Sequence, residues 1–193
     1  MRANRIWELA GLVCVVLLAL PVSIWAGDQG SRWKDYNDAG FKAYLQGDYA
    51  EAEKQFMDAI KEGEGFGPED NRLAASLNNL AGLYRAQVKY AEAEPLYRRS
   101  LAIGEKVLGP DHPDVATSLN NLAELYDAQG KYTEAEPLYR RSLAIGEKAL
   151  GPDHPDVATV LENYAALLRK MQHTTEAEKM EARAKSIRAK HVQ

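Results

Sequence analysis

The 193-residue sequence is poor in cysteine and phenylalanine and carries no large excess of charge of either sign. A single cysteine excludes an intrachain disulfide framework and a cysteine-based zinc site. The net charge of −4 offers no broad basic surface, so a nucleic-acid partner is not expected. No Asn-x-Ser/Thr acceptor for glycosylation occurs. Hydrophobic residues still make up 46% of the chain and charged residues 27%, which is typical of a folded protein rather than a disordered one.

The N-terminus holds the longest apolar run. Two arginines precede a run from Leu9 to Trp25, and Ala26 is followed by polar residues. This layout predicts a secretory signal peptide over residues 1–26, cleaved after Ala26. The alternative is an uncleaved membrane anchor, although the run is shorter than the roughly 20 residues that span a bilayer. Residues 27–32 would then form a linker. We expect the rest of the chain in the bacterial periplasm or secreted, or else membrane-anchored outside the cytoplasm.

A 42-residue period organises the remaining sequence. Residues 74–115 and 116–157 align without a gap and are identical at 36 of 42 positions. Weaker copies flank them, which predicts four repeats. The expected bounds of these repeats are 33–73, 74–115, 116–157 and 158–193. The six differences between the two closest repeats are Ala75/Thr117, Gly82/Glu124, Arg85/Asp127, Val88/Gly130, Ala91/Thr133 and Val107/Ala149.

Each repeat predicts two helices and no strand. In the first half, apolar residues recur at spacings of three and four, as Leu119, Leu122 and Tyr126 show. Gly130 is placed to end this helix in a left-handed conformation. The second half starts near Thr133 with a glutamate three residues on, which predicts a capping box. Helix pairs that repeat in this way stack into an all-α solenoid.

These residues resemble the tetratricopeptide repeat. Its pattern of large, small and aromatic positions is met in the third repeat by Leu119, Ala123, Tyr126, Ala135, Tyr139 and Ser142. The 42-residue period and the ending Leu-Gly-Pro-Asp-His-Pro-Asp-Val are similar to the kinesin-light-chain type of this repeat. The resemblance implies a right-handed α-solenoid whose first helices line a concave groove. It also implies that this groove binds a peptide or a partner protein.

The resemblance places one set of first-helix side chains in that groove. The expected partner-binding residues are Tyr44, Asn79, Arg85, Asn121, Glu124, Asp127, Asn163 and Arg169. Asparagine both donates and accepts hydrogen bonds, so it can pair with a peptide backbone of any sequence. The alternative is that the asparagines bond to the adjacent helix and fix the stacking of the repeats.

Charge along the groove points to the kind of ligand. One row of equivalent positions reads Tyr44, Arg85, Asp127 and Arg169, an alternation that favours a zwitterionic ligand surface. Three of the six differences between the closest repeats fall at groove positions. A recognition face that diverges after a duplication would give this pattern, and so would drift of the surface.

The motifs that could carry chemistry have simpler explanations. The run Asp111–Asp114 recurs as Asp153–Asp156, and its His and Asp side chains could bind a metal. Aspartate also caps helix N-termini and proline suits the first turn, so we expect a cap and no metal site. No nucleophile or acid–base pair stands out. The sequence therefore predicts a non-enzymatic scaffold or adaptor without a cofactor.

Two expectations concern the ends of the chain. The basic stretch Lys179–Lys190 is expected to form a soluble end cap, with weak binding to anionic lipid as the alternative. If the leader is uncleaved, the alternative function is a membrane-anchored assembly factor for an envelope complex that associates with itself through exposed repeat edges. Membrane contact is expected only through residues 1–26 in that case, and the sequence predicts no oligomeric state.

Overall fold

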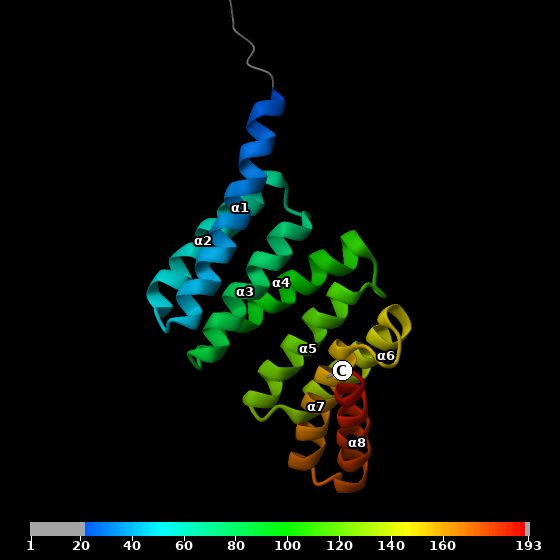
Figure 1. The fold of residues 1–193 in the computed structure, drawn as a ribbon. Helices are drawn as coiled ribbons and strands as arrows, with labels where there is room; N and C mark the ends of the chain where they lie inside the picture. The colour runs from blue at the N-terminus through cyan, green and yellow to red at the C-terminus, as the bar shows by residue number, and fades with distance from the viewer. Residues whose placement is uncertain (1–21, 192–193) are drawn as a thin grey trace, which may run out of the picture.

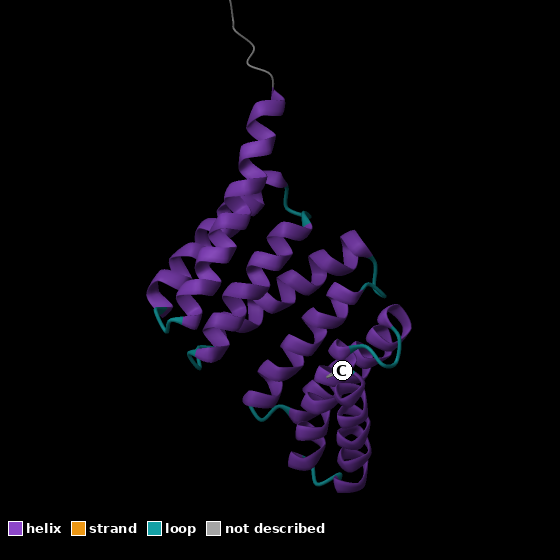
Figure 2. Ribbon diagram, viewed as in Figure 1, coloured by secondary structure: helices purple, strands orange, loops and turns teal. Residues whose placement is uncertain are grey.

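The fold is a row of helix pairs. The computed structural model describes residues 22–191, and the side chains of residues 30–191. Within those residues it contains eight helices and no strand (Figures 1 and 2). The helices are α1 (Val22–Leu45), α2 (Tyr49–Phe66), α3 (Asn71–Ala86), α4 (Tyr90–Leu108), α5 (Pro113–Ala128), α6 (Tyr132–Leu150), α7 (Pro155–Lys170) and α8 (Thr174–Lys190).

The helices pair in chain order and the pairs stack. The first helices α1, α3, α5 and α7 each pack against the second helix that follows, and α2, α4 and α6 each pack against the first helix of the next repeat. Successive first helices also contact one another. The pairs follow one another from α1 to α8 with a progressive rotation (Figure 1). The described residues thus form four helix pairs. The helices α3, α5 and α7 each begin three residues before an expected repeat start, whereas α1 begins at Val22, eleven residues before residue 33.

The described residues include only part of the predicted N-terminal leader but all of the predicted linker. Most of the expected leader lies outside the described residues. The expected linker at residues 27–32 is instead helical, because α1 runs without a break from Val22 to Leu45. The indole of Trp33 holds this helix to α3 by donating to the Arg72 carbonyl at 3.2 Å and to the Ser76 hydroxyl at 2.8 Å.

The recurring spacing of small and large residues builds the core. All six positions of the repeat pattern in the third repeat are buried. Serines at the end of the pattern bond across the helix pair, where Ser100 donates to the Ala74 carbonyl and Ser142 to the Ala116 carbonyl, both at 2.7 Å. Because each pair covers the next, burial runs along the array rather than into one central core.

The helix ends confirm one prediction and correct two. Gly130 follows α5 with a φ of +73°, as predicted. The predicted capping box is wrong, because α6 begins at Tyr132 and its N-cap residue, Lys131, makes no side-chain cap bond. The cap at the start of α5 comes from His112 and not from an aspartate, since its Nδ1 accepts from the Asp114 backbone N–H at 3.1 Å. His154 caps α7 in the same way.

Candidate functional site

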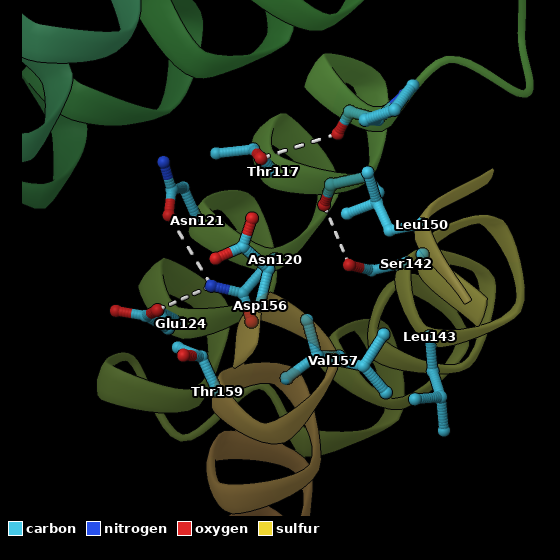
Figure 3. Close-up of a pocket in the computed structure, with 14 residues that line it drawn as sticks. Thr117, Asn120, Asn121, Glu124, Ser142, Leu143, Leu150, Asp156, Val157 and Thr159 are labelled. Atoms are coloured by element: carbon cyan, nitrogen blue, oxygen red, sulfur yellow. Dashed lines mark hydrogen bonds between the residues drawn. The ribbon is translucent and has the colours of Figure 1, made fainter. Parts of the chain in front are cut away.

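The first helices α1, α3, α5 and α7 line one face of the array, the first-helix face. Two equivalent cavities lie on it. One, of about 210 Å³, is lined by α5, α6 and α7 and includes Thr117, Asn121 and Glu124 (Figure 3). The other has the same volume and lies one repeat earlier, lined by α3, α4 and α5. Its lining includes the equivalent Asn79, and Thr117 lies on both. The repeat thus produces the same hollow twice along one face.

The predicted asparagines lie on this face and form a ladder between the first helices. Each amide Nδ2 donates to the side-chain oxygen of an asparagine on the preceding first helix. The three bonds are Asn79 to Asn37 at 2.9 Å, Asn121 to Asn78 at 3.1 Å, and Asn163 to Asn120 at 3.2 Å. The geometry is that of the stacking alternative, although Asn79, Asn121 and Asn163 remain partly exposed. Peptide binding by this ladder stays a prediction.

Arg85 and Glu124 form the centre of the face. Nη1 of Arg85 on α3 lies 2.6 Å from Oε2 of Glu124 on α5. Glu124 also accepts from Asn120 at 2.7 Å and from Asn163 at 2.8 Å, so one carboxylate joins three first helices. Figure 3 shows Asn120 between Asn121 and Glu124, with bonds to both. The pKa of the Arg85 guanidinium is raised, because Glu124 and a nearby tyrosine outweigh the cost of burial.

The remaining charged groove residues are also paired within the chain. Nζ of Lys170 on α7 donates to both carboxylate oxygens of Asp127 on α5, at 2.8 and 2.7 Å. Arg169 makes two bonds to Glu181 on α8, at 2.6 and 2.7 Å. The row of alternating charge is therefore neutralised by neighbouring helices, which weakens the argument for a zwitterionic ligand.

Aromatic groups occupy the N-terminal end of the face and the layer beneath it. Tyr44 packs near Tyr49 on α2, with ring centroids 5.9 Å apart. Tyr97 and Tyr139 lie below the first helices and are almost fully buried. Burial raises the pKa of both phenols, and for Tyr139 the carboxylates of Glu124 and Asp127 raise it further. Both hydroxyls therefore stay protonated and can act as hydrogen-bond donors.

A second pair of cavities lies on the opposite, second-helix face. One of about 290 Å³ includes Ala102, Tyr126 and Glu134, and its equivalent of about 300 Å³ lies one repeat later. Sequence reasoning assigned no site here. The signal that could have found it is the 42-residue recurrence of an arginine and a glutamate, since Arg98 pairs with Glu94 and Arg140 with Glu136. Each arginine also meets a tyrosine of the next first helix, Tyr126 or Tyr164, although these two tyrosines are not at equivalent positions.

Metal and membrane sites have no candidates in the described chain. Between residues 22 and 191, no three His, Cys, Asp or Glu side chains come together as a metal site would require. No helix of that part of the chain has both the length and the apolar character needed to cross a membrane. Three cations of the C-terminal helix pair with the array, Arg183 with Glu147, Arg188 with Glu162, and Lys190 with Asp153. These pairs favour the end cap over lipid binding.

The helix pairs stack into an α-solenoid with recurring cavities on both faces. A tetratricopeptide repeat profile matches residues 72–148 and 128–190. The chain belongs to the tetratricopeptide repeat family. Domains of this family bind protein or peptide partners and serve as scaffolds for protein–protein interaction. A comparison with curated protein sequences finds no significant match.

Solved structures share the fold. BtubC (BKLC) from P. vanneervenii is 26% identical with a TM-score of 0.74, over 82% of this chain and 64% of that one. A kinesin light chain candidate from Podosopora anserina with nearly identical TPR-like repeats is 26% identical with a TM-score of 0.66, over 88% and 83%. The apo form of RapI, at 18% identity and a TM-score of 0.73, covers 83% and 57% and supports the fold alone. The chain thus spans less than two thirds of BtubC. The similarity to kinesin-light-chain repeats agrees with the resemblance read from the sequence.

Proposed function

We propose that this chain is an exported, non-enzymatic scaffold that binds a peptide or partner protein on its first-helix face. The observation that carries the proposal is the recurrence of one 210 Å³ cavity at two successive interfaces. Small side chains such as Ala75 and Thr117 leave these hollows open, while the asparagine ladder offers polar groups at their edge. An extended segment could therefore lie across both cavities and repeat its contacts after one helix pair.

The asparagines themselves make poor probes of this site, because each also stacks the repeats. Thr117 is a better one, since it is exposed and lines both cavities. Ala102 on α4 is an exposed helical residue of the opposite face and provides a matched control. Both positions accept the same long, charged substitution, so Thr117→Arg and Ala102→Arg differ mainly in which face they block.

Affinity capture with the tagged protein from its native cell envelope tests the proposal. Thr117→Arg should abolish capture of the specific partner, while Ala102→Arg should retain it, with helicity by circular dichroism unchanged in both. Equal capture by the two variants would contradict the assignment of the first-helix face. Loss with Ala102→Arg alone would assign binding to the second-helix face.

Export is the second part of the proposal. It rests on the arginines, the apolar run and Ala26 of residues 1–26, which have the order of a signal peptide. Cleavage after Ala26 would remove residues 22–26 from α1 and leave the packed part of that helix, from Trp33 onward, intact. N-terminal sequencing of the exported protein should find Gly27 first, and a retained Arg2 would instead indicate an anchor.

One observation favours the alternative function, a self-associating assembly factor. At the N-terminal end of the array, Phe41 and Leu45 on α1 are 50% and 80% exposed, and Tyr49 is 43% exposed. Exposed apolar groups in one place mark interaction sites on otherwise soluble proteins. If this end drives self-association, light scattering should give a dimer mass for the mature chain and a monomer mass for Leu45→Ser. A monomer mass for both would exclude this route.

A further inference from the structure

Most contacts between neighbouring repeats are the same at every interface. On α4, α6 and α8, an arginine pairs with a glutamate of the preceding second helix. The series is Arg99 with Glu64, Arg141 with Glu105, and Arg183 with Glu147. A lysine series recurs in the same way, each lysine pairing with an acid in the loop that precedes its repeat: Lys106 with Glu69, Lys148 with Asp111, and Lys190 with Asp153. The asparagine ladder also recurs at all three interfaces. Bonds that recur in this way hold any repeat against any other.

One row of contacts differs at each interface. Between the first two repeats, Tyr44 packs against the apolar cluster that contains Leu80 and Leu83 of α3, and no charge pair forms in this row. Between the second and third, the equivalent residue is Arg85, which pairs with Glu124 at 2.6 Å. Between the third and fourth, it is Asp127, which pairs with Lys170 at 2.7 Å.

The residues that face these groups on the next first helix also differ from repeat to repeat. The place held by Glu124 in the third repeat is Gly82 in the second. The place held by Lys170 in the fourth is alanine in the two repeats before it. Each contact is thus complementary only between its own two repeats, as apolar against apolar, positive against negative, and negative against positive.

We propose that these unlike contacts encode the order of the repeats. The second and third repeats share 36 of 42 residues, so their common surfaces cannot distinguish one neighbour from another. Two of the six differences, Gly82/Glu124 and Arg85/Asp127, fall in this row. If the second and third repeats exchanged these residues, the aspartate now at position 85 would face a glycine at position 124. The arginine now at position 127 would face Lys170. One charge would lose its partner, and two like charges would meet. Specificity by such mismatches is how related helical surfaces avoid wrong pairing.

The differences at positions 82, 85, 124 and 127 could reflect either the order of the repeats or a recognition face that diverged to bind a ligand. A diverging recognition face would leave folding unchanged when the residues are exchanged, because no partner is needed for the array to form. An order code predicts a folding defect in the isolated protein. The two explanations are therefore separated by stability measurements without any ligand.

The near identity of the repeats allows an exchange at constant composition. The variant Gly82→Glu/Arg85→Asp/Glu124→Gly/Asp127→Arg swaps the order-coding residues and keeps the net charge. The backbone at position 82 accepts a side chain, because a Cβ there would lie 3.5 Å from the Tyr97 hydroxyl, an ordinary contact. The matched control exchanges three other differences, as Val88→Gly/Ala91→Thr/Val107→Ala/Gly130→Val/Thr133→Ala/Ala149→Val. These lie at turns and helix ends, away from the row.

Thermal unfolding followed by circular dichroism measures the outcome. The order exchange should lower the melting midpoint by at least about 2–4 °C, the shift typical of one lost interaction in a chain of this size. The control exchange should melt within about 1 °C of the unaltered protein, because it moves each cost from one repeat to the other. An order exchange that melts with the control would overturn the proposal.

A further substitution keeps the test decisive if the exchanged protein folds poorly. Lys170→Asp places an acid opposite Asp127 in the unaltered protein, but opposite arginine in the exchanged one. It should therefore lower the midpoint in the first background and raise it, or restore helicity, in the second. The same sign in both backgrounds would show that this row does not discriminate between neighbours.

Discussion

At the scale of single residues, the two closest repeats place different side chains in the same backbone conformation. Val88 and Gly130 both follow a first helix with positive φ, at +63° and +73°. A β-branched residue is strained in the left-handed region, whereas glycine is not. The sequence predicted the turn from Gly130, and it offered no sign that valine would adopt the same conformation. The surrounding helix pair imposes it, since Lys89 N–H still bonds to the Tyr84 carbonyl at 2.9 Å.

Substitutions at Val88 and Gly130 should change the stability of the protein in opposite directions. Val88→Gly should stabilise the protein by about 0.5–1 kcal/mol, because relief of left-handed strain exceeds the added freedom of the unfolded chain. Val88 is 66% exposed, so little packing is lost. Gly130→Val should destabilise it by about 1 kcal/mol for the converse reason. Urea unfolding of both variants checks the signs, and a loss of stability in Val88→Gly would contradict the strain.

Asp70 gives a residue-scale prediction of pH dependence. Its carboxylate caps α3 by accepting from the Arg72 backbone N–H at 2.8 Å, and it also accepts from the Arg72 guanidinium at 2.9 and 2.8 Å. These bonds hold the pKa of Asp70 below its usual value in the folded protein. The stabilisation is therefore complete above the unfolded pKa of about 3.9, and it is lost as the pH falls through the lower folded value.

Asp70→Asn removes that titration while keeping a side chain that can cap the helix. The stability difference between the unaltered protein and the variant, from urea unfolding, should be larger at pH 7 than at pH 3. Other carboxylates titrate in both proteins and cancel in the comparison. A difference that does not change with pH would mean that ionised Asp70 contributes nothing through Arg72.

At the scale of helices, the sequence predicted the elements and missed how several begin. Periodicity located all four helix pairs, because apolar spacing reflects which face is buried. Caps depend on the exact backbone turn, which the packed neighbours decide. Thr133 shows this, since α6 begins one residue before it and its hydroxyl bonds to Glu134 rather than to the backbone. Asp111 shows it as well, because that side chain pairs with Lys148 and leaves the cap to His112.

The corrected caps predict a contrast between two substitutions. His112→Ala should destabilise the protein by about 1 kcal/mol through loss of the N-cap bond. Thr133→Ala should change stability by less than about 0.5 kcal/mol, as expected for a surface side chain without a cap role. Chemical denaturation of the two variants and of His112→Asn, which retains a capping side chain, provides the measurement. Equal losses for His112→Ala and Thr133→Ala would restore the predicted capping box.

At the scale of the whole molecule, the two ends of the array differ. The C-terminal repeat is closed by ion pairs within the chain, such as Arg169 with Glu181 and Arg188 with Glu162. The N-terminal repeat instead leaves Phe41 and Leu45 exposed. Repeat arrays need polar ends to stay soluble, and within residues 30–191 the N-terminal repeat departs from this rule.

Family resemblance placed Asn121, Glu124 and Asp127 together on a partner-binding face. In the structure Asn121 and Glu124 line one cavity and Asp127 does not, and partner binding by these residues stays a prediction. The bonding partners of these residues could not be predicted from the sequence, because Lys170 and Asn163 lie on the next first helix. Only the stacking geometry shows which side chains meet. The site therefore holds together largely through bonds between repeats, and the face it presents is set by small residues such as Thr117.

Photo-crosslinking tests the central claim of a partner-binding first-helix face most directly. A photoreactive phenylalanine analogue placed at Thr117, or in a matched variant at Ala102, reports which face lies against a partner in the native cells. If the first-helix face binds the partner, a discrete crosslinked protein should form from position 117 and none from position 102. Crosslinks from position 102 alone would contradict it.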